Sequence, residues 1–322
     1  EAVPGTVQYL TICFIGIPCI TAYNVLASIF RGMGDSRSPM YFIAAACVVN
    51  IGLDFFFMGA LRLGPAGAAL GTTLSQAVSV LLAFCVILKR KSIRLSKSDF
   101  CPRKATMKDI LSIGLPVAAQ DGFIQVSFML ITIMANQRGL TDAAAVGIVE
   151  KIISFLFLVP SSMLSTVSAL GAHNIGAGKY DRVDDILRYA IAIGVGFGAV
   201  MALLMQFIAP SMVRPFTSDE AVVLAGAAYI RSYIFDCLFA GIQFSFSGYF
   251  CAWGRSGLSF LHNTLSILLV RVPGAWLACR FFPQTLVPMG LAPACGSLFS
   301  SIVCVLLYRW MKRQNKPTGD KD

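Results

Sequence analysis

An aspartate and an asparagine lie four residues apart in the apolar stretch VVNIGLDFFF, residues 48–57. Residues at this spacing share one face of a helix, so Asn50 and Asp54 would present an amide beside a carboxylate. An acid inside a membrane costs about 2.5–3.5 kcal/mol on insertion scales, so an acid at such a position is usually functional. Carboxylate and amide oxygens can hold a cation, and a buried carboxyl can take up a proton. We therefore predict ion binding at this pair, with a hydrogen bond between helices as the alternative.

Other polar side chains also interrupt apolar stretches. Gln120 and Asp121 follow a proline that can bend a helix, and we expect them to face a cavity. Asp236 lies in a later stretch and is a candidate for the same cavity. The alternative for Asp236 is a polar tie to Arg231 or Arg271.

No catalytic motif accompanies these acids. The ten cysteines contain no CxxC pair, and nine of them lie in apolar stretches, which is typical of small packing residues. The two histidines, His173 and His262, are far apart in the sequence. We predict that the protein is not an enzyme, that it has no cofactor, and that it has no metal site apart from Na⁺ at Asp54.

The elements that carry these residues are long apolar runs. The chain has 322 residues, of which 57% are hydrophobic and 13% charged, and its mean hydropathy is +0.74. Soluble domains carry about 25% charged residues, and runs of 18 or more apolar residues indicate membrane-spanning helices. The runs are too long, and show too little alternation, for barrel strands. The sequence predicts an all-α polytopic membrane protein with spans near 6–30, 39–60, 66–88, 109–136, 142–170, 186–209, 221–251, 258–281 and 286–310.

The net charge of +10 follows from topology rather than from nucleic-acid binding. When alternate links are assigned to one side of the membrane, that side holds 19 lysines and arginines and the other side holds 4. This imbalance places the first side, with the C-terminus, in the cytoplasm. Anionic lipid headgroups are then the expected contacts of the basic links.

Two parts of the chain resemble each other. The segment FRGMGDSRSPM begins at Phe30, and AWGRSGLSFLH begins at Ala252; placing Gly34 on Gly254 gives an offset of 220 residues. Each is a short turn after a long span, followed by two further helices. The comparison predicts two homologous bundles, a second of six helices and a first of three, with three helices expected before Glu1. Parallel repeats of this kind are a transporter architecture.

Several stretches together resemble one family, the multidrug and toxic compound extrusion (MATE) transporters. In order along the chain they are RGMGDSRSPM (31–40), NIGLD (50–54), GPAGAALGTTLSQ (64–76), IGLPVAAQ (113–120) and GAHNIGAGKYDRV (171–183). The resemblance implies twelve helices in two lobes around a central cavity. It also implies cation-driven export of drug-like compounds.

The resemblance carries over to single residues. It implies that Asp54 and Asn50 form the cation site of the first lobe together with a threonine, which here is Thr72. We expect Tyr23 to face the same cavity, the alternative being packing with its hydroxyl on a neighbour. Some members carry a functional glutamate on the helix of Asp121; the corresponding positions here, 123–125, read FIQ.

We predict a partial first lobe at 1–91, a basic cytoplasmic linker at 92–108, a second lobe at 109–311 and a cytoplasmic tail at 312–322. The expected function is antiport of a small amphipathic, often cationic substrate against Na⁺ or H⁺ in a bacterial plasma membrane, by a monomer that binds membrane lipid and no nucleic acid. The alternatives are a lipid-linked oligosaccharide or lipid flippase of the same superfamily, or a fragment without function.

Overall fold

The computed structural model describes residues 3–89 and 103–314, and the regular secondary structure within these ranges is entirely helical. The chain divides into two compact units, residues 1–102 and 103–322. Each unit is held together by contacts among its own helices.

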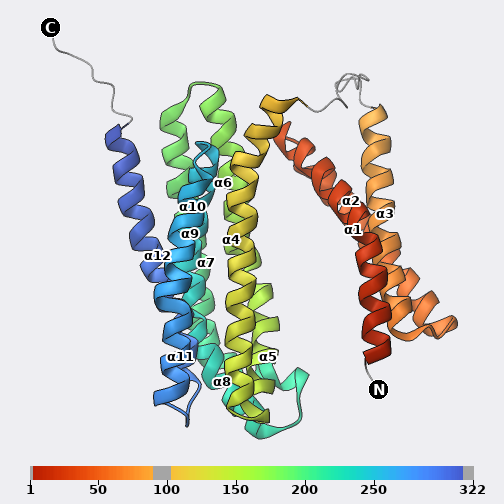
Figure 1. Cartoon of the computed structure of the whole chain (residues 1–322), viewed down its shortest axis with the longest axis vertical. Coiled ribbons are helices and arrows are strands. Elements are labelled where there is room, and N and C mark those ends of the chain that lie inside the picture. The colour runs from red at the N-terminus through yellow and green to blue at the C-terminus, as the bar shows by residue number, and fades with distance from the viewer. Residues whose placement is uncertain (1–2, 90–102, 315–322) are drawn as a thin grey trace. The chain divides into compact units, whose positions relative to one another are not determined.

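The first unit is a three-helix assembly, coloured red to orange in Figure 1. Helix α3 packs along both α1 and α2. At Gly16 of α1 an added Cβ would lie 2.7 Å from the hydroxyl oxygen of Thr73, so the two backbones approach closely because a side chain is missing. The elements are α1 (Val3–Gly32), α2 (Arg37–Asp54), the π-helix η1 (Phe55–Ala60) and α3 (Gly64–Lys89).

The second unit has α9 at its centre, packed against α6, α7 and α12, while α10 packs against α4. Several of its spans are interrupted helices. A proline at Pro273 lacks the N–H that would continue the helical ladder, and the π-helix η4 ends just before it. The elements are α4 (Lys104–Gln137), α5 (Leu140–Leu156), α6 (Leu158–Gly176), α7 (Tyr180–Val213), the 3₁₀ turn η3 (Arg214–Phe216), α8 (Glu220–Tyr233), α9 (Phe235–Ala252), α10 (Ser256–Ser266), η4 (Ile267–Arg271), α11 (Val272–Phe281) and α12 (Val287–Gln314).

Nine helical stretches of the described residues are long and apolar enough to cross a membrane, which confirms the nine predicted spans. The shortest, Arg37–Ala60, has 24 residues, and at 1.5 Å per residue it is roughly 36 Å long. A bilayer core is about 30 Å thick. Large apolar side chains cover the outside of both units, as lipid-facing surfaces require; Phe14, Leu203 and Phe207 are among them.

The two turns matched by the 220-residue offset have the same geometry. Gly34 and Gly254 both have positive φ, 83° and 68°, a region that favours glycine. In the first turn the N–H of residue 35 donates to the carbonyl of Phe30 (2.9 Å), and in the second the N–H of residue 255 donates to that of Phe250 (2.8 Å). The two matched turns thus share one backbone geometry, a glycine helix cap that also occurs at Gly178, where the N–H of residue 179 donates to the carbonyl of residue 174.

The interior of the second unit contains buried polar side chains in addition to its apolar clusters. His262 is fully buried, with Nδ1 2.7 Å from the Ser300 hydroxyl and Nε2 3.0 Å from the Ser247 hydroxyl. The ring thus connects α10 to α12 and to α9. Small hydroxyl residues allow close packing of membrane helices and satisfy one another where no water is present.

Candidate functional site

Asn50 and Asp54, the two side chains predicted to bind an ion, lie at the contact between α2 and α3. A Cβ added to Gly71 of α3 would overlap the Oδ1 atom of Asp54 and would lie 3.5 Å from Nδ2 of Asn50. Both α2 side chains therefore point at the same glycine, as their four-residue spacing predicts. The glycine leaves the space that the carboxylate fills.

Thr72 follows Gly71 directly, so the third residue implied by the family resemblance belongs to the same stretch of α3. Its hydroxyl donates to the carbonyl of Ala68 at 3.0 Å. That bond uses the hydroxyl proton and leaves lone pairs on the oxygen, which can act as a ligand.

The Asp54 carboxylate is half-buried and poorly satisfied. Its Oδ1 atom and Nδ2 of Asn50 are buried without a hydrogen-bond partner among the described residues. No ion pair found in the described ranges includes Asp54. An unpaired buried carboxylate is unfavourable, and a cation or a proton would relieve the cost. The arrangement is chemically suited to either.

A hollow of about 330 Å³ opens beside this carboxylate. It is lined by Asp54 together with Ile51, Phe55, Met58 and Gly59. Three of these residues belong to the π-helix η1 that continues α2. Short π segments are often found at functional sites, since they redirect the side chains of a helix.

One neighbour of the site, and one further buried polar group on α3, were not identified from the sequence. Tyr9 of α1 is close enough to Asp54 for an electrostatic interaction between them, and no sequence pattern connects the two positions. Gln76 lies one turn beyond Thr72 on α3, and its Oε1 is buried without a partner among the described residues. The four-residue spacing from Thr72 was the signal that could have identified it.

Tyr23 lies in a packing contact. It is 5% exposed, and its hydroxyl donates to the carbonyl of Pro39 at 3.0 Å, which connects α1 to the start of α2. Phe30 and Phe42 belong to the same apolar cluster. This geometry corresponds to the packing alternative weighed for Tyr23.

In the second unit, Gln120 and Asp121 face different ways, as adjacent residues of a helix do. Gln120 is buried, and its Oε1 accepts a hydrogen bond of 2.7 Å from the Ser259 hydroxyl of α10. Asp121 is exposed on the surface of α4. The structure therefore separates the two candidates that the sequence placed together.

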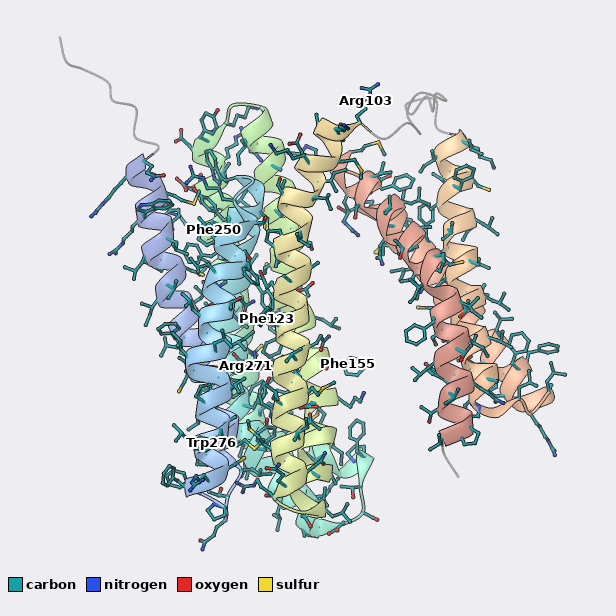
Figure 2. The ribbon with its side chains drawn as sticks, viewed as in Figure 1. Arg103, Phe123, Phe155, Phe250, Arg271 and Trp276 are labelled. Carbon is teal, nitrogen blue, oxygen red and sulfur yellow. The ribbon has the colours of Figure 1, made fainter. Side chains whose placement is uncertain are left out.

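Asp236 is enclosed inside the second unit, with 0% of its surface exposed. Its Oδ2 atom lies 3.9 Å from Nη2 of Arg271. The alternative tie to Arg231 does not form, because the Nε atom of that arginine donates to the backbone carbonyl of Gln206 at 3.1 Å. Figure 2 labels Arg271 between the neighbouring helices of this unit.

No group of three or more histidine, cysteine, aspartate or glutamate side chains in residues 3–89 and 103–314 could hold a metal ion. The structure brings Asp54 and Asn50 of α2 together against Gly71 of α3, and these two side chains, with Thr72 next to that glycine in the sequence, remain the candidate site.

Nine apolar spans and a half-buried acid within one of them define an integral membrane protein of the polytopic helical class. The sequence profile of the MatE family matches residues 1–56 and 116–277, and the chain belongs to this family of transporters, which are not enzymes.

Named relatives agree with the family. The chain is 29% identical over 311 residues to "Probable multidrug resistance protein YpnP" of Bacillus subtilis, which covers 96% of this chain and 68% of that protein. It is 28% identical over 257 residues to "Multidrug export protein MepA" of Staphylococcus haemolyticus, covering 79% of this chain and 56% of that one.

Solved structures share the fold. An outward-facing multidrug resistance MATE family transporter superposes with a TM-score of 0.90 at 22% identity, over 99% of this chain and 72% of that one. A MATE crystal structure in the straight conformation gives a TM-score of 0.90 at 22% identity, over 98% and 71%. These matches confirm the predicted all-helical MATE-type bundle.

Proposed function

We propose that the protein is a secondary antiporter that exports small drug-like, often cationic compounds in exchange for Na⁺ or H⁺. Asp54, with Asn50 and Thr72, takes up the coupling ion. The relatives named for multidrug resistance and export support the substrate class.

One observation carries the proposal: the Asp54 Oδ1 atom is buried, has no hydrogen-bond donor among the described residues, and is directed at a glycine. A carboxylate in this state gains much from a cation or a proton. An ion that binds one conformation of the transporter more tightly than the other shifts their populations, and this difference supplies the coupling.

We further propose that the protein resides in a bacterial plasma membrane with its C-terminus in the cytoplasm. The imbalance of 19 to 4 basic residues between the two sets of links supports this orientation. Cysteine labelling of tail and outer-link positions in intact cells would test it. Labelling of the tail by an impermeant reagent would contradict it.

The test of transport uses purified protein in proteoliposomes with an imposed Na⁺ or H⁺ gradient and a fluorescent cationic dye. Asp54→Asn keeps the size of the side chain and removes its charge, so we expect gradient-driven efflux to fall to the level of empty liposomes. Asp109→Asn removes an exposed acid of α4 and is the matched control, expected to transport as the wild type. Gradient-driven efflux that persists in Asp54→Asn would refute the proposal.

A flippase for a lipid-linked pyrophosphate would need a cluster of basic side chains facing a cavity. The two arginines inside spans of the second unit are otherwise engaged: Arg271 lies beside Asp236, and Arg231 donates to a backbone carbonyl. These contacts favour the antiporter over the flippase.

A further inference from the structure

Arg271 occupies an unusual position for a cation inside a membrane protein. It ends the π-helix η4, one residue before Val272 and two before Pro273. Its side chain is 9% exposed and that of Asp236 is 1% exposed. An arginine cannot lose its charge inside a protein, so its environment must compensate for a permanent cation.

Three groups surround the guanidinium. Nη2 donates to the hydroxyl of Tyr233 at 2.8 Å, the ring of Phe128 lies 4.8 Å from the guanidinium carbon, and the Oδ2 atom of Asp236 lies 3.9 Å from Nη2. These contacts come from α8, α4 and α9. The cation is thus held by a hydroxyl, an aromatic face and one carboxylate.

A glycine of α12 leaves space for the backbone end of this arginine, as Gly71 leaves space for Asp54. A Cβ added to Gly296 of α12 would lie 3.2 Å from the Cβ of Arg271. Gly296 is followed by Ser297, as Gly71 of the first unit is followed by Thr72. In each unit a glycine of the last helix therefore lies beside a charged residue of the preceding span, and the charge is negative in the first unit and positive in the second.

The second unit holds a further acid near this arginine. Glu150 is the other acid that interacts electrostatically with Arg271, and its carboxylate accepts a hydrogen bond of 3.0 Å from the Thr132 hydroxyl. Of these two acids, Asp236 is the one in an ion pair among the described residues, and its two carboxylate oxygens have no hydrogen-bond partner there. In the first unit, by contrast, no ion pair of the described residues includes Asp54.

We propose that Arg271 is a tethered counter-cation for Asp236, so that Asp236 takes up no coupling ion and Asp54 does so. The inference rests on the proposed function for the role of Asp54. A dissolved cation that approached Asp236 would meet a guanidinium that is covalently attached and always charged. Repulsion between the two cations, in an interior of low dielectric, excludes the dissolved one.

The first test removes the acid and its counter-cation together. Asp236→Asn/Arg271→Gln keeps the local net charge and similar side-chain volumes. Gradient-driven dye efflux by this variant is expected to show the same half-saturating cation concentration as the wild type, and the same number of cations exchanged per dye. Loss of coupled efflux, or a lower cation-to-dye ratio, would overturn the proposal.

A second measurement leaves the interior of the second unit intact and does not depend on folding of the double variant. Equilibrium binding of ²²Na⁺, and proton uptake followed with a pH indicator, are measured on detergent-solubilised wild type and on Asp54→Asn. We expect Asp54→Asn to lose all saturable uptake of the ion that the wild type binds. If Asp54→Asn keeps some saturable uptake, and this uptake disappears in the double variant Asp54→Asn/Asp236→Asn, then Arg271 does not exclude ions from Asp236 and the proposal is refuted.

The two proposals fail in different ways. Coupled efflux that survives Asp54→Asn contradicts the proposed function, whereas coupled efflux that depends on Asp236 contradicts only the role of Arg271. The single variant Arg271→Gln adds a third outcome. It leaves Asp236 without its counter-cation, so we expect this variant to gain a second saturable cation site that the wild type lacks.

Discussion

The space at Gly71 predicts that one added methyl group will disable the ion site. The Cβ of Gly71→Ala would fall on the Oδ1 atom of Asp54, and it would lie 3.5 Å from Nδ2 of Asn50. Gly71 is buried in the contact between α2 and α3, so neither backbone can yield without disturbing the packing. The carboxylate must therefore leave the position at which it binds the ion.

The size of the effect follows from the cost of overpacking. An extra methylene in a well-packed interior costs about 1–3 kcal/mol. If the carboxylate must recover its native position to bind the ion, that cost appears in the binding free energy, and a cost of about 1–3 kcal/mol corresponds to about 5–150-fold weaker ion affinity. Alanine is also a better helix former than glycine by about 0.8–1 kcal/mol, which offsets part of the loss in stability but none of the loss in affinity.

The assay measures the half-saturating cation concentration for dye efflux from proteoliposomes. Gly52→Ala, on α2 near Asp54, is the matched control because a Cβ there meets nothing within 4 Å. We expect this control to behave as the wild type. A thermal double-mutant cycle with Asp54→Ala isolates the clash, since Gly71→Ala should destabilise the wild type but not the variant that lacks the carboxylate. Unchanged cation affinity in Gly71→Ala would refute the reasoning.

Three further predictions concern the second unit and are checked by thermal unfolding in detergent. Arg138→Ala should lower the unfolding free energy by about 3–5 kcal/mol, because this arginine pairs with Asp142 at 2.7 Å and donates to three backbone carbonyls of residues 282–285; Arg138→Lys should restore little of it. His262→Phe should cost about 1–3 kcal/mol for each of the two serine hydroxyls it leaves without a partner. Lys312→Met should cost less than about 1 kcal/mol despite the short contact with Asp184, because the lysine side chain is half exposed; a larger loss would contradict this interpretation.

Hydropathy alone was sufficient for the membrane spans, because a long apolar run must become a helix in lipid whatever its neighbours are. The helices extend a few residues beyond the predicted runs. The fourth run was expected at 109–136, and α4 covers Lys104–Gln137. The apolar run marks the part in lipid, and the helix continues into the polar link until a capping or turn residue ends it.

The local part of the ion site could also be predicted, because the spacing of Asn50 and Asp54 fixes a shared helix face. The opposing surface could not. That Gly71 faces these two residues depends on how α2 and α3 pair, and no spacing within one helix contains that information. The same limit applies to Asp236, for which sequence left two arginines open and tertiary packing selected Arg271.

The two buried acids differ in their cationic neighbours, and this contrast bears on where coupling can occur: Arg271 lies beside Asp236, whereas no ion pair of the described residues includes Asp54. An acid that exchanges its ion during each cycle must bind that ion weakly in at least one conformation. A site that holds its ion equally tightly in both conformations cannot shift their populations. Both acids have carboxylate oxygens without a hydrogen-bond partner among the described residues, but only Asp54 also lacks a cation beside it there, and it therefore meets that requirement. Asp236 is paired with the side chain of Arg271 in the same unit. Because this cation cannot dissociate, it compensates the charge of Asp236 equally before and after ion release. A difference in ion affinity between conformations can therefore arise at Asp54, whereas the pair of Asp236 and Arg271 contributes to the stability of its own unit.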